Sequence, residues 1–411
     1  ARHRPAHRRS DHRAAHALRY FLPPPPSPFT GHERTATKLE VNLRRNRAQD
    51  QTAHIDAAAQ AFDYDACRDR WWNEEEQSLL HGTPLWDEAS EAQRRVLNQL
   101  YWVAYYSQII SAEVATIYFN QTSAAGLYGL EGFRTVCDVL DLESSQERAH
   151  IAAFKRVGDA TEAALFGERV FTWSMRGPFE PTMIFSDLGP FRAAFRRLEL
   201  RAFGLLSAGS AFIGCQYFTV RGLRTLNGKM VQQRLARYHK QQDADAPAPI
   251  PTAISHSHFL DESFHFNSSA IIGTDVIRCL PSPTPFERHI ANLALRGCQR
   301  DHSNVSVTVR GLFWDDTAAW TAVRKVLTSP TFGMTPRDAH DMIRRCYTEE
   351  TDALHAAHAM QGEARAAYQR FVEGLDYVTR ENRDMAILGA CSLERTLRRH
   401  REAFRRLPCP P

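Results

Sequence analysis

Hydrophobic positions recur along most of this chain every three or four residues, which is the spacing of one face of an α-helix. The clearest start signal is the capping box SEAQ that begins at Ser90, and an apolar stretch rich in aromatic residues follows it. Four helices are therefore predicted in the first two thirds of the chain. They run from Ser90 to about Asn120, from Leu142, capped by Asp141, to about Phe166, from Gly189-Pro190 onwards, and from Thr252 to near Gly273.

The last third continues the helical pattern. Amphipathic helices are predicted over Pro336–Thr348 and Thr351–Tyr377. Strand signals are sparse, and Val305–Leu312 is the best of them. The sequence therefore predicts an all-α protein.

Proline-rich breaks divide the chain into three parts. Residues 1–50 are rich in Arg and His around the run Pro23–Pro28, so we expect a disordered basic tail; metal binding by its histidines is the alternative. Residues 51–280 are predicted to form a helical bundle. Residues 281–411, after the break Pro281–Pro285, are predicted to form a helical extension packed on or beside that bundle.

Composition narrows the function classes. The 51 Lys and Arg residues nearly balance the 47 Asp and Glu residues, and a net charge of +4 excludes a nucleic-acid binder driven by overall charge. The 8 cysteines are scattered without a CxxC motif, so a zinc ribbon, a thioredoxin site and a secreted disulfide framework are not expected. The N-terminal region lacks the hydrophobic stretch of a signal peptide, and we expect a cytoplasmic protein.

One uncharged run, Ala202–Val220, has the length of a membrane span. Its glycine, serine, glutamine and threonine residues make it only weakly apolar. We expect a buried helix that packs closely through these small residues, and no membrane span.

The candidate chemistry lies in acidic residues and histidines of the four predicted central helices. Residues three and four apart share one helix face, so an E-x-x-H pair can point at a single spot. The chain carries this pair twice, and in each case a lone glutamate on another helix precedes it. In order, the residues are Glu113, then Glu147 and His150, then Glu199, then His258, Glu262 and His265.

Each of these acids occupies the apolar stripe of its predicted helix; Glu113, for example, is flanked by Ile109, Ile110 and Ile117. A buried carboxylate must be protonated, paired with a cation or bound to metal. Few basic residues share these stripes. Four carboxylates are neutralised by two divalent cations, and carboxylate with imidazole suits iron, or manganese as an alternative. Two-metal bundles of the ferritin-like class use this arrangement of ligands.

The order of ligands, with the extra histidine one turn before the second E-x-x-H, resembles the p-aminobenzoate N-oxygenase family of diiron enzymes over about Trp71–Gly273. The resemblance implies a ferritin-like bundle with two iron ions that uses O2 and external electrons to oxidise an aryl amine. The implied metal ligands are Glu113, Glu147, His150, Glu199, His258, Glu262 and His265, with Gln216 as an alternative to Glu199.

Several functions remain open beside N-oxygenation. The rivals are C–H hydroxylation or desaturation at the same centre, iron oxidation or storage without an organic substrate, and a helical interaction module whose buried acids are hydrogen-bonded. The expected partners are a small-molecule substrate and an external electron donor, a reductase or ferredoxin, with a homodimer as one possibility for the assembly. Neither nucleic acid nor membrane is an expected partner.

A second group of metal-ligand residue types, Asp352, His355 and His358, lies at helical spacing, but an exposed amphipathic helix explains it as well. An arginine-rich segment near the C-terminus, Arg395–Arg406, is interpreted as a solvated helix end.

Overall fold

The computed structural model describes residues 27–171, 190–242, 247–304, 311–312 and 317–408. Its described residues form helices and contain no strand, which confirms the all-α prediction. The strand expected over Val305–Leu312 falls almost entirely outside the described residues. The main helices are α2 (Glu33–Ala48), α3 (Thr52–Gln60), α4 (Pro84–Glu88), α5 (Glu91–Leu127), α6 (Arg134–Phe166), α7 (Pro190–Gly209), α8 (Ala211–Gln241), α9 (Ile250–Ala270), α10 (Pro285–Asn304), α11 (Thr317–Leu327), α12 (Pro336–Thr348), α13 (Asp352–Val372), α14 (Arg380–Arg383), α15 (Ala386–Gly389) and α16 (Leu393–Phe404).

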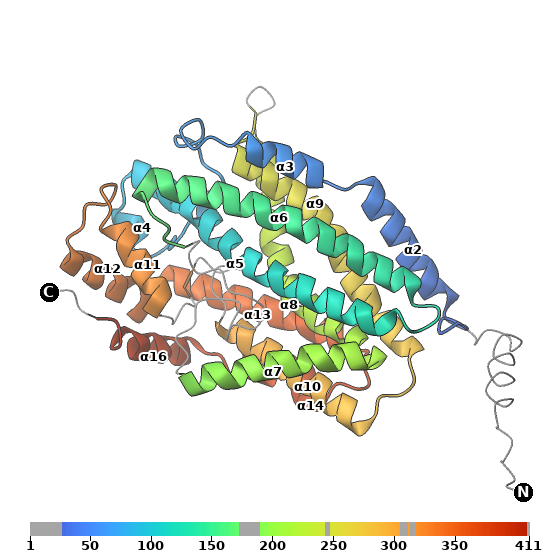
Figure 1. Ribbon diagram of the computed structural model, residues 1–411. Helices are drawn as coiled ribbons and strands as arrows, with labels where there is room; N and C mark the ends of the chain where they lie inside the picture. The colour runs from blue at the N-terminus through green and yellow to red at the C-terminus, as the bar shows by residue number, and fades with distance from the viewer. Residues whose placement is uncertain (1–26, 172–189, 243–246, 305–310, 313–316, 409–411) are drawn as a thin grey trace, which may run out of the picture.

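Four long helices, α5, α6, α8 and α9, form a closed bundle (Figure 1). Helix α5 packs against α6 and α8, and α9 packs against the same two helices, so each helix has two neighbours within the bundle. A four-helix arrangement of this kind places side chains from all four helices in one interior. Helix α7 lies outside it, against α5 and α8.

The observed helix boundaries confirm one of the predicted helix caps and contradict two others. The Ser90 side chain accepts from the backbone of Gln93 and the Gln93 side chain accepts in return, so the predicted capping box starts α5. Helix α6 begins at Arg134, before the predicted start, and Asp141 is no cap because it lies inside the helix. Thr252 is likewise inside α9, where its hydroxyl donates to the carbonyl of Trp72.

The uncharged run Ala202–Val220 is divided between two helices. Ser210 stands between α7 and α8, and its side chain caps α8 by accepting from the backbone N–H of Ile213. The small residues do permit close packing, since a Cβ at Gly204 would lie 2.5 Å from the hydroxyl of Tyr118. Within the described residues, we find no helix that combines the length and apolar character needed to cross a bilayer.

The expected disordered tail is wrong over Glu33–Ala48, which forms α2. This helix is mostly polar, yet its few apolar side chains line one face, and Leu39 and Leu43 are buried against the bundle. Asn46 exchanges two hydrogen bonds with Gln146 of α6. Composition alone misses such a helix because tertiary contacts stabilise it. Residues 1–26 lie outside the described part of the chain.

The C-terminal helices share their core with the bundle. One continuous hydrophobic cluster contains Trp102 of α5 together with Trp320 and Met342 of the C-terminal part. A second cluster joins Phe218 of α8 to Tyr368 of α13. Helices α10 and α13 both pack against α8, so residues after 280 cover one side of the bundle.

Candidate metal centre

Six of the seven predicted ligands converge in the interior of the bundle. Glu113 comes from α5, Glu147 and His150 come from α6, and the other three come from α9. Their ligand atoms form two groups, in each of which the atoms lie within 4.8 Å of one another. The first group is Glu113, His150, His258 and Glu262, and the second is Glu147, Glu262 and His265.

The inward-facing atoms of this cluster are close enough to share bound cations. His258 Nε2 lies 3.3 Å from Glu113 Oε1 and 3.5 Å from Glu262 Oε1. His265 Nδ1 lies 2.9 Å from Glu262 Oε1, and His150 Nδ1 lies 3.3 Å from Glu147 Oε2. Glu262 belongs to both groups, so its carboxylate would take part in holding an ion in either of them.

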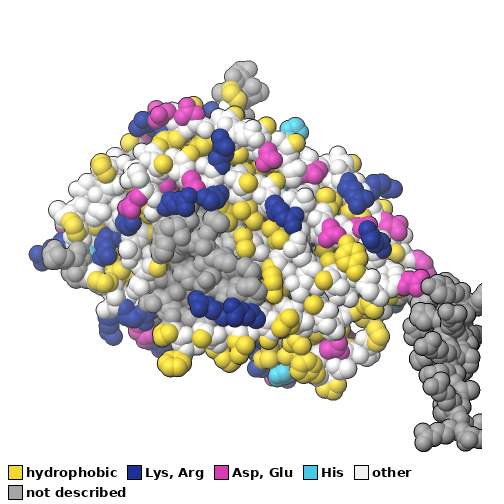
Figure 2. All heavy atoms as spheres, viewed as in Figure 1, with side chains coloured by type: hydrophobic (Ala, Val, Ile, Leu, Met, Phe, Trp, Pro, Cys, Tyr) yellow, Lys and Arg dark blue, Asp and Glu magenta, His cyan; other side chains and the backbone are white. Residues whose placement is uncertain are grey.

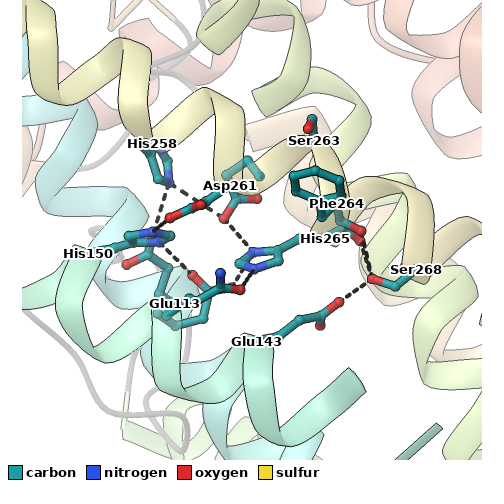
Figure 3. A network of polar contacts seen from close by, with 12 residues as sticks. Glu113, Glu143, His150, His258, Asp261, Ser263, Phe264, His265 and Ser268 are labelled. Carbon is teal, nitrogen blue, oxygen red and sulfur yellow. Dashed lines mark hydrogen bonds and ion pairs between the residues drawn. The ribbon is translucent and has the colours of Figure 1, made fainter. Parts of the chain in front are cut away.

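Two further residues contact the outer nitrogens of these imidazoles, and one of them, Asp261, is labelled in Figure 3. His150 Nε2 lies 3.1 Å from Asp261 Oδ2, and His265 Nε2 lies 2.9 Å from Gln146 Oε1. Such partners fix the ring orientation and keep the other nitrogen, Nδ1, facing the centre. Sequence analysis missed both residues, although Asp261 and Gln146 each directly precede a predicted ligand glutamate.

A buried ion pair borders the second group. Arg221 of α8 pairs through Nη1 with Glu143 of α6, and its Nη2 lies 3.4 Å from Glu147 Oε1. The hydroxyl of Ser268 also donates to Glu143. Sequence analysis missed this pair too. The sequence feature that could have indicated it is the position of Glu143, one turn before Glu147 on the same face of the same helix.

The prediction for Glu199 is wrong, because its side chain is exposed on α7 and belongs to neither ligand group. The predicted third helix is broken at Ser210, so α8 takes the place in the bundle that was expected for the segment carrying Glu199. The alternative, Gln216, lies on α8 and is buried without a hydrogen-bond partner, but it belongs to neither group.

The ionisation of the cluster follows from burial and mutual contact. Burial raises the pKa of Glu113 well above its ordinary value, and the charge of Glu147 adds to this effect. For Glu147 and Glu262 burial acts in the same direction, but the neighbouring histidines outweigh it and lower the pKa of both carboxyl groups. Burial disfavours protonation of His150, yet hydrogen bonds to Asp261 and Glu147 raise its pKa to about 9. Protons on the histidines thus supply the positive charge that metal ions supply on binding.

The donor set fits a metal centre. Both carboxylate oxygens of Glu113 and both ring nitrogens of His258 are buried without a hydrogen-bond partner, which is costly unless a cation completes them. Carboxylate and imidazole donors suit iron or manganese. Five buried carboxylates and one arginine give the cluster a net charge of −4 with neutral histidines, which two divalent ions offset. The five are Glu113, Glu143, Glu147, Asp261 and Glu262.

The second group of metal-ligand residue types does not assemble into a site. His355 is exposed and lies 2.7 Å from Glu350, whereas His358 contacts the carbonyl of Cys391. These contacts agree with the exposed amphipathic helix that explained the pattern. Among the described residues, only the two groups in the bundle bring three or more potential metal ligands together.

Comparison with known proteins gives one match. A family model described as "Acyl halogenase CylC-like" matches residues 34–188 and 182–408. No curated protein and no solved structure matches the chain. This match does not confirm the p-aminobenzoate N-oxygenase family, but it agrees with the broader prediction of a metal-dependent oxidative enzyme. Since the matched residues span nearly the whole chain, this protein belongs to the CylC-like acyl halogenase family.

Proposed function

We propose that this protein is an iron-dependent oxidative enzyme that halogenates an acyl substrate at a two-metal centre, with O2 as co-substrate and electrons from an external donor. The observation that carries the proposal is the convergence of Glu113, His150, His258, Glu262, Glu147 and His265 in one dry interior. Membership in the acyl halogenase family supports the reaction and the substrate class.

The two irons would supply oxidation chemistry with O2, and the chain's own residues prepare the place for it. Asp261 and Gln146 hold His150 and His265 with Nδ1 turned inward. The rings of Phe154 and Tyr106 pack with their centroids 4.8 Å and 5.6 Å from that of His258, which keeps water from this side of the centre. Excluding water protects a strong oxidant from wasteful reactions.

The exposure of the ligands indicates the side from which a substrate approaches. The three histidines are completely buried, whereas Glu113 and Glu262 are 5% and 6% exposed. These two residues, whose exposure is small but not zero, lie on α5 and α9, the two helices that flank α8. We therefore propose that the acyl group reaches the centre along α8, between α5 and α9.

N-oxygenation of an aryl amine remains the second candidate, and His258 is the observation that favours it. The third histidine was the residue that distinguished the N-oxygenase pattern, and its Nε2 does face the cluster. C–H hydroxylation or desaturation would follow from the same centre if no halide were used. An external reductase or ferredoxin and a homodimeric assembly remain parts of this proposal.

A product assay separates these reactions. The protein is loaded anaerobically with Fe(II), mixed with an acyl thioester or an aryl amine, and given O2 and a reductant with or without chloride. We expect a chlorinated acyl product by mass spectrometry, formed only with chloride. An oxygenated amine would instead establish the second candidate, and iron oxidation without any organic product would contradict both.

The matched variants for this assay are Glu262→Ala and Glu363→Ala. Glu262 belongs to both ligand groups, whereas Glu363 is an exposed residue of α13. We expect the first variant to lose bound iron and product together and the second to keep both. Full activity in Glu262→Ala would remove the metal centre from the mechanism.

A further inference from the structure

The two ligand groups of the centre are unequal. Four residues surround one metal position and only three surround the other, and Glu262 is counted in both. The first group draws on α5, α6 and α9, and the second on α6 and α9 alone. Helix α8, the remaining helix of the bundle, gives no acid to either group among the described residues. The position formed by Glu147, Glu262 and His265 therefore keeps more coordination places open to a ligand from outside the protein.

Helix α8 brings a cation to this position instead of an acid. Arg221 is 3% exposed, pairs with Glu143, and lies 3.4 Å from Glu147. Its Nε is buried and has no hydrogen-bond partner. An unsatisfied N–H of a charged guanidinium in a dry interior is costly, and an anion beside it removes that cost.

The face of α8 beside the cluster also leaves space. Arg221, Thr225, Gly228 and Gln232 recur every three or four residues and so share one face. Arg221 contacts Glu147 of α6, and the Gln232 side chain lies near the Tyr105 hydroxyl of α5, so this face is turned into the bundle. A Cβ at Gly228 would meet nothing within 4 Å, and the Thr225 hydroxyl is occupied by the carbonyl of Gly222.

We infer that a small monovalent anion, a halide, binds between the three-residue metal position and Arg221. The inference rests on the proposed function and deepens it, because it names the place where a halogenase of this fold would hold its halide. A halide matches the site in size and in the sign of its charge, since it is a single-atom anion beside the buried guanidinium of Arg221. It matches in chemistry as well. A halide can accept a hydrogen bond from the Nε–H of Arg221 and bind a metal ion, and it needs no further hydrogen-bond donor in an apolar interior.

The inference makes metal and halide binding depend on each other at one position only. An anion held at the weaker position raises the affinity of the metal there, and the metal raises the affinity of the anion by the same factor. The four-residue position does not border Arg221 and should not respond to halide. Halide should therefore change the second binding step and leave the first unchanged.

The test is an anaerobic titration of the metal-free protein with Co(II), followed by absorbance and calorimetry. It is run in sodium gluconate and, at equal ionic strength, in sodium chloride or bromide. We expect two binding steps, with the weaker tightened about tenfold or more by halide. Its ligand-field spectrum should differ between chloride and bromide, because the halide is bound to the metal.

The outcomes separate this inference from the proposed function. Two Co(II) bound with affinities and spectra indifferent to halide would overturn the inference and leave the metal centre standing. An equal effect of halide on both steps would also overturn it. Failure to bind metal at all would overturn the proposed function and the inference together.

Variants of α8 locate the halide. Arg221→Lys should abolish the halide effect on the second step, whereas Arg224→Lys, whose side chain pairs with Asp301, should keep it. Because loss of Arg221 leaves Glu143 poorly paired, Gly228→Glu provides a second, independent variant. Its carboxylate should fill the space and make the second step tight without halide, with Gly362→Glu on α13 as its control. A halide effect that persists in both Arg221→Lys and Gly228→Glu would contradict the location.

Discussion

At the scale of residues, two of the three imidazoles in the centre are held at both ring nitrogens. His150 and His265 turn Nδ1 to the cluster and Nε2 to a polar partner from a neighbouring helix. The partner differs, since His150 meets the carboxylate of Asp261 and His265 meets the amide of Gln146. A carboxylate makes an imidazole a stronger donor to metal than an amide does.

Replacement of Asp261 by Asn should therefore weaken metal binding without unfolding the protein. The amide oxygen of Asn can still accept from the backbone N–H of Gln51, which Asp261 now does at 2.9 Å. We expect the affinity for the first metal ion to fall about 10–100-fold, measured by Co(II) titration. Asp275→Asn, at a residue that pairs with Lys38, is the control. Unchanged affinity in Asp261→Asn would mean that His150 is not a ligand.

A second residue-scale prediction concerns His302, which is buried beside Tyr368. Burial, together with the charge of Arg224, lowers the pKa of His302 from 6.5 to about 4. As the pH falls from 6.5 to 4, His302 binds a proton in the unfolded chain but stays neutral in the folded protein. The free energy of unfolding should thus decrease by up to about 3 kcal/mol from this group.

The His302→Gln variant should lose this part of the pH dependence. Urea unfolding at pH 7, 6 and 5 should give a smaller decrease for this variant than for the unchanged protein. His355→Gln, at an exposed residue, should keep the full decrease. If the free energy of unfolding decreased equally with falling pH in His302→Gln and in the unchanged protein, His302 would not stay neutral in the folded state.

At the scale of elements, glycines set how closely the helices around the centre approach. A Cβ at Gly273, just after α9, would lie 2.5 Å from the backbone nitrogen of Thr219 in α8. The Thr219 hydroxyl donates to the carbonyl of Gly273 at 2.6 Å, and the hydroxyl of Tyr377 donates to Thr219 in turn. Backbone meets backbone here, so no flexible side chain can move aside.

Gly273→Ala should therefore force α8 away from the end of α9. We expect a loss of about 1–3 kcal/mol in the free energy of unfolding, as for other overpacked sites. Gly362→Ala is the matched control, since its Cβ meets nothing within 4 Å and alanine favours the helix interior. Equal stability of the two variants would contradict the close approach of α8 and α9.

Also at this scale, α7 presents large apolar side chains to the surface. Phe191 is 90% exposed and Leu205 is 75% exposed. Figure 2 shows hydrophobic side chains gathered along the lower part of this face, over α7 and α10. The apolar stripe from which a buried Glu199 was predicted is therefore present in α7, but several of its side chains face solvent.

At the scale of the whole molecule, the bundle depends on the helices that follow it. Helices α10 and α13 cover α8, and the two hydrophobic clusters both run from the bundle into the C-terminal half. Tyr368 of α13 and Leu295 of α10 are buried in the same cluster as Phe218. Residues 51–280 alone would expose this apolar surface to water.

A fragment ending at residue 280 should therefore fail to fold as an independent domain. We expect it to aggregate or to lack a cooperative thermal transition, in contrast to the full chain. Circular dichroism and gel filtration of both proteins check this expectation. A soluble fragment that unfolds cooperatively and binds two metal ions would show that the bundle is autonomous and the later helices are an accessory.

The sequence by itself determined the helical class and six of the residues that converge in the two candidate ligand groups. Both rest on periodicity, because E-x-x-H on an apolar stripe places its side chains on one buried face whatever surrounds the helix. The capping box at Ser90 likewise needs only neighbouring residues. These features are local, so the order of residues is enough to predict them.

Only the tertiary structure decided which helix completes the bundle. The break at Ser210 puts α8 in the interior and leaves Glu199 on the surface, although both segments carry apolar stripes. Arg221 then faces Glu143 across helices that are far apart in sequence. Periodicity tells which residues share a face, but which face meets which depends on packing between distant segments.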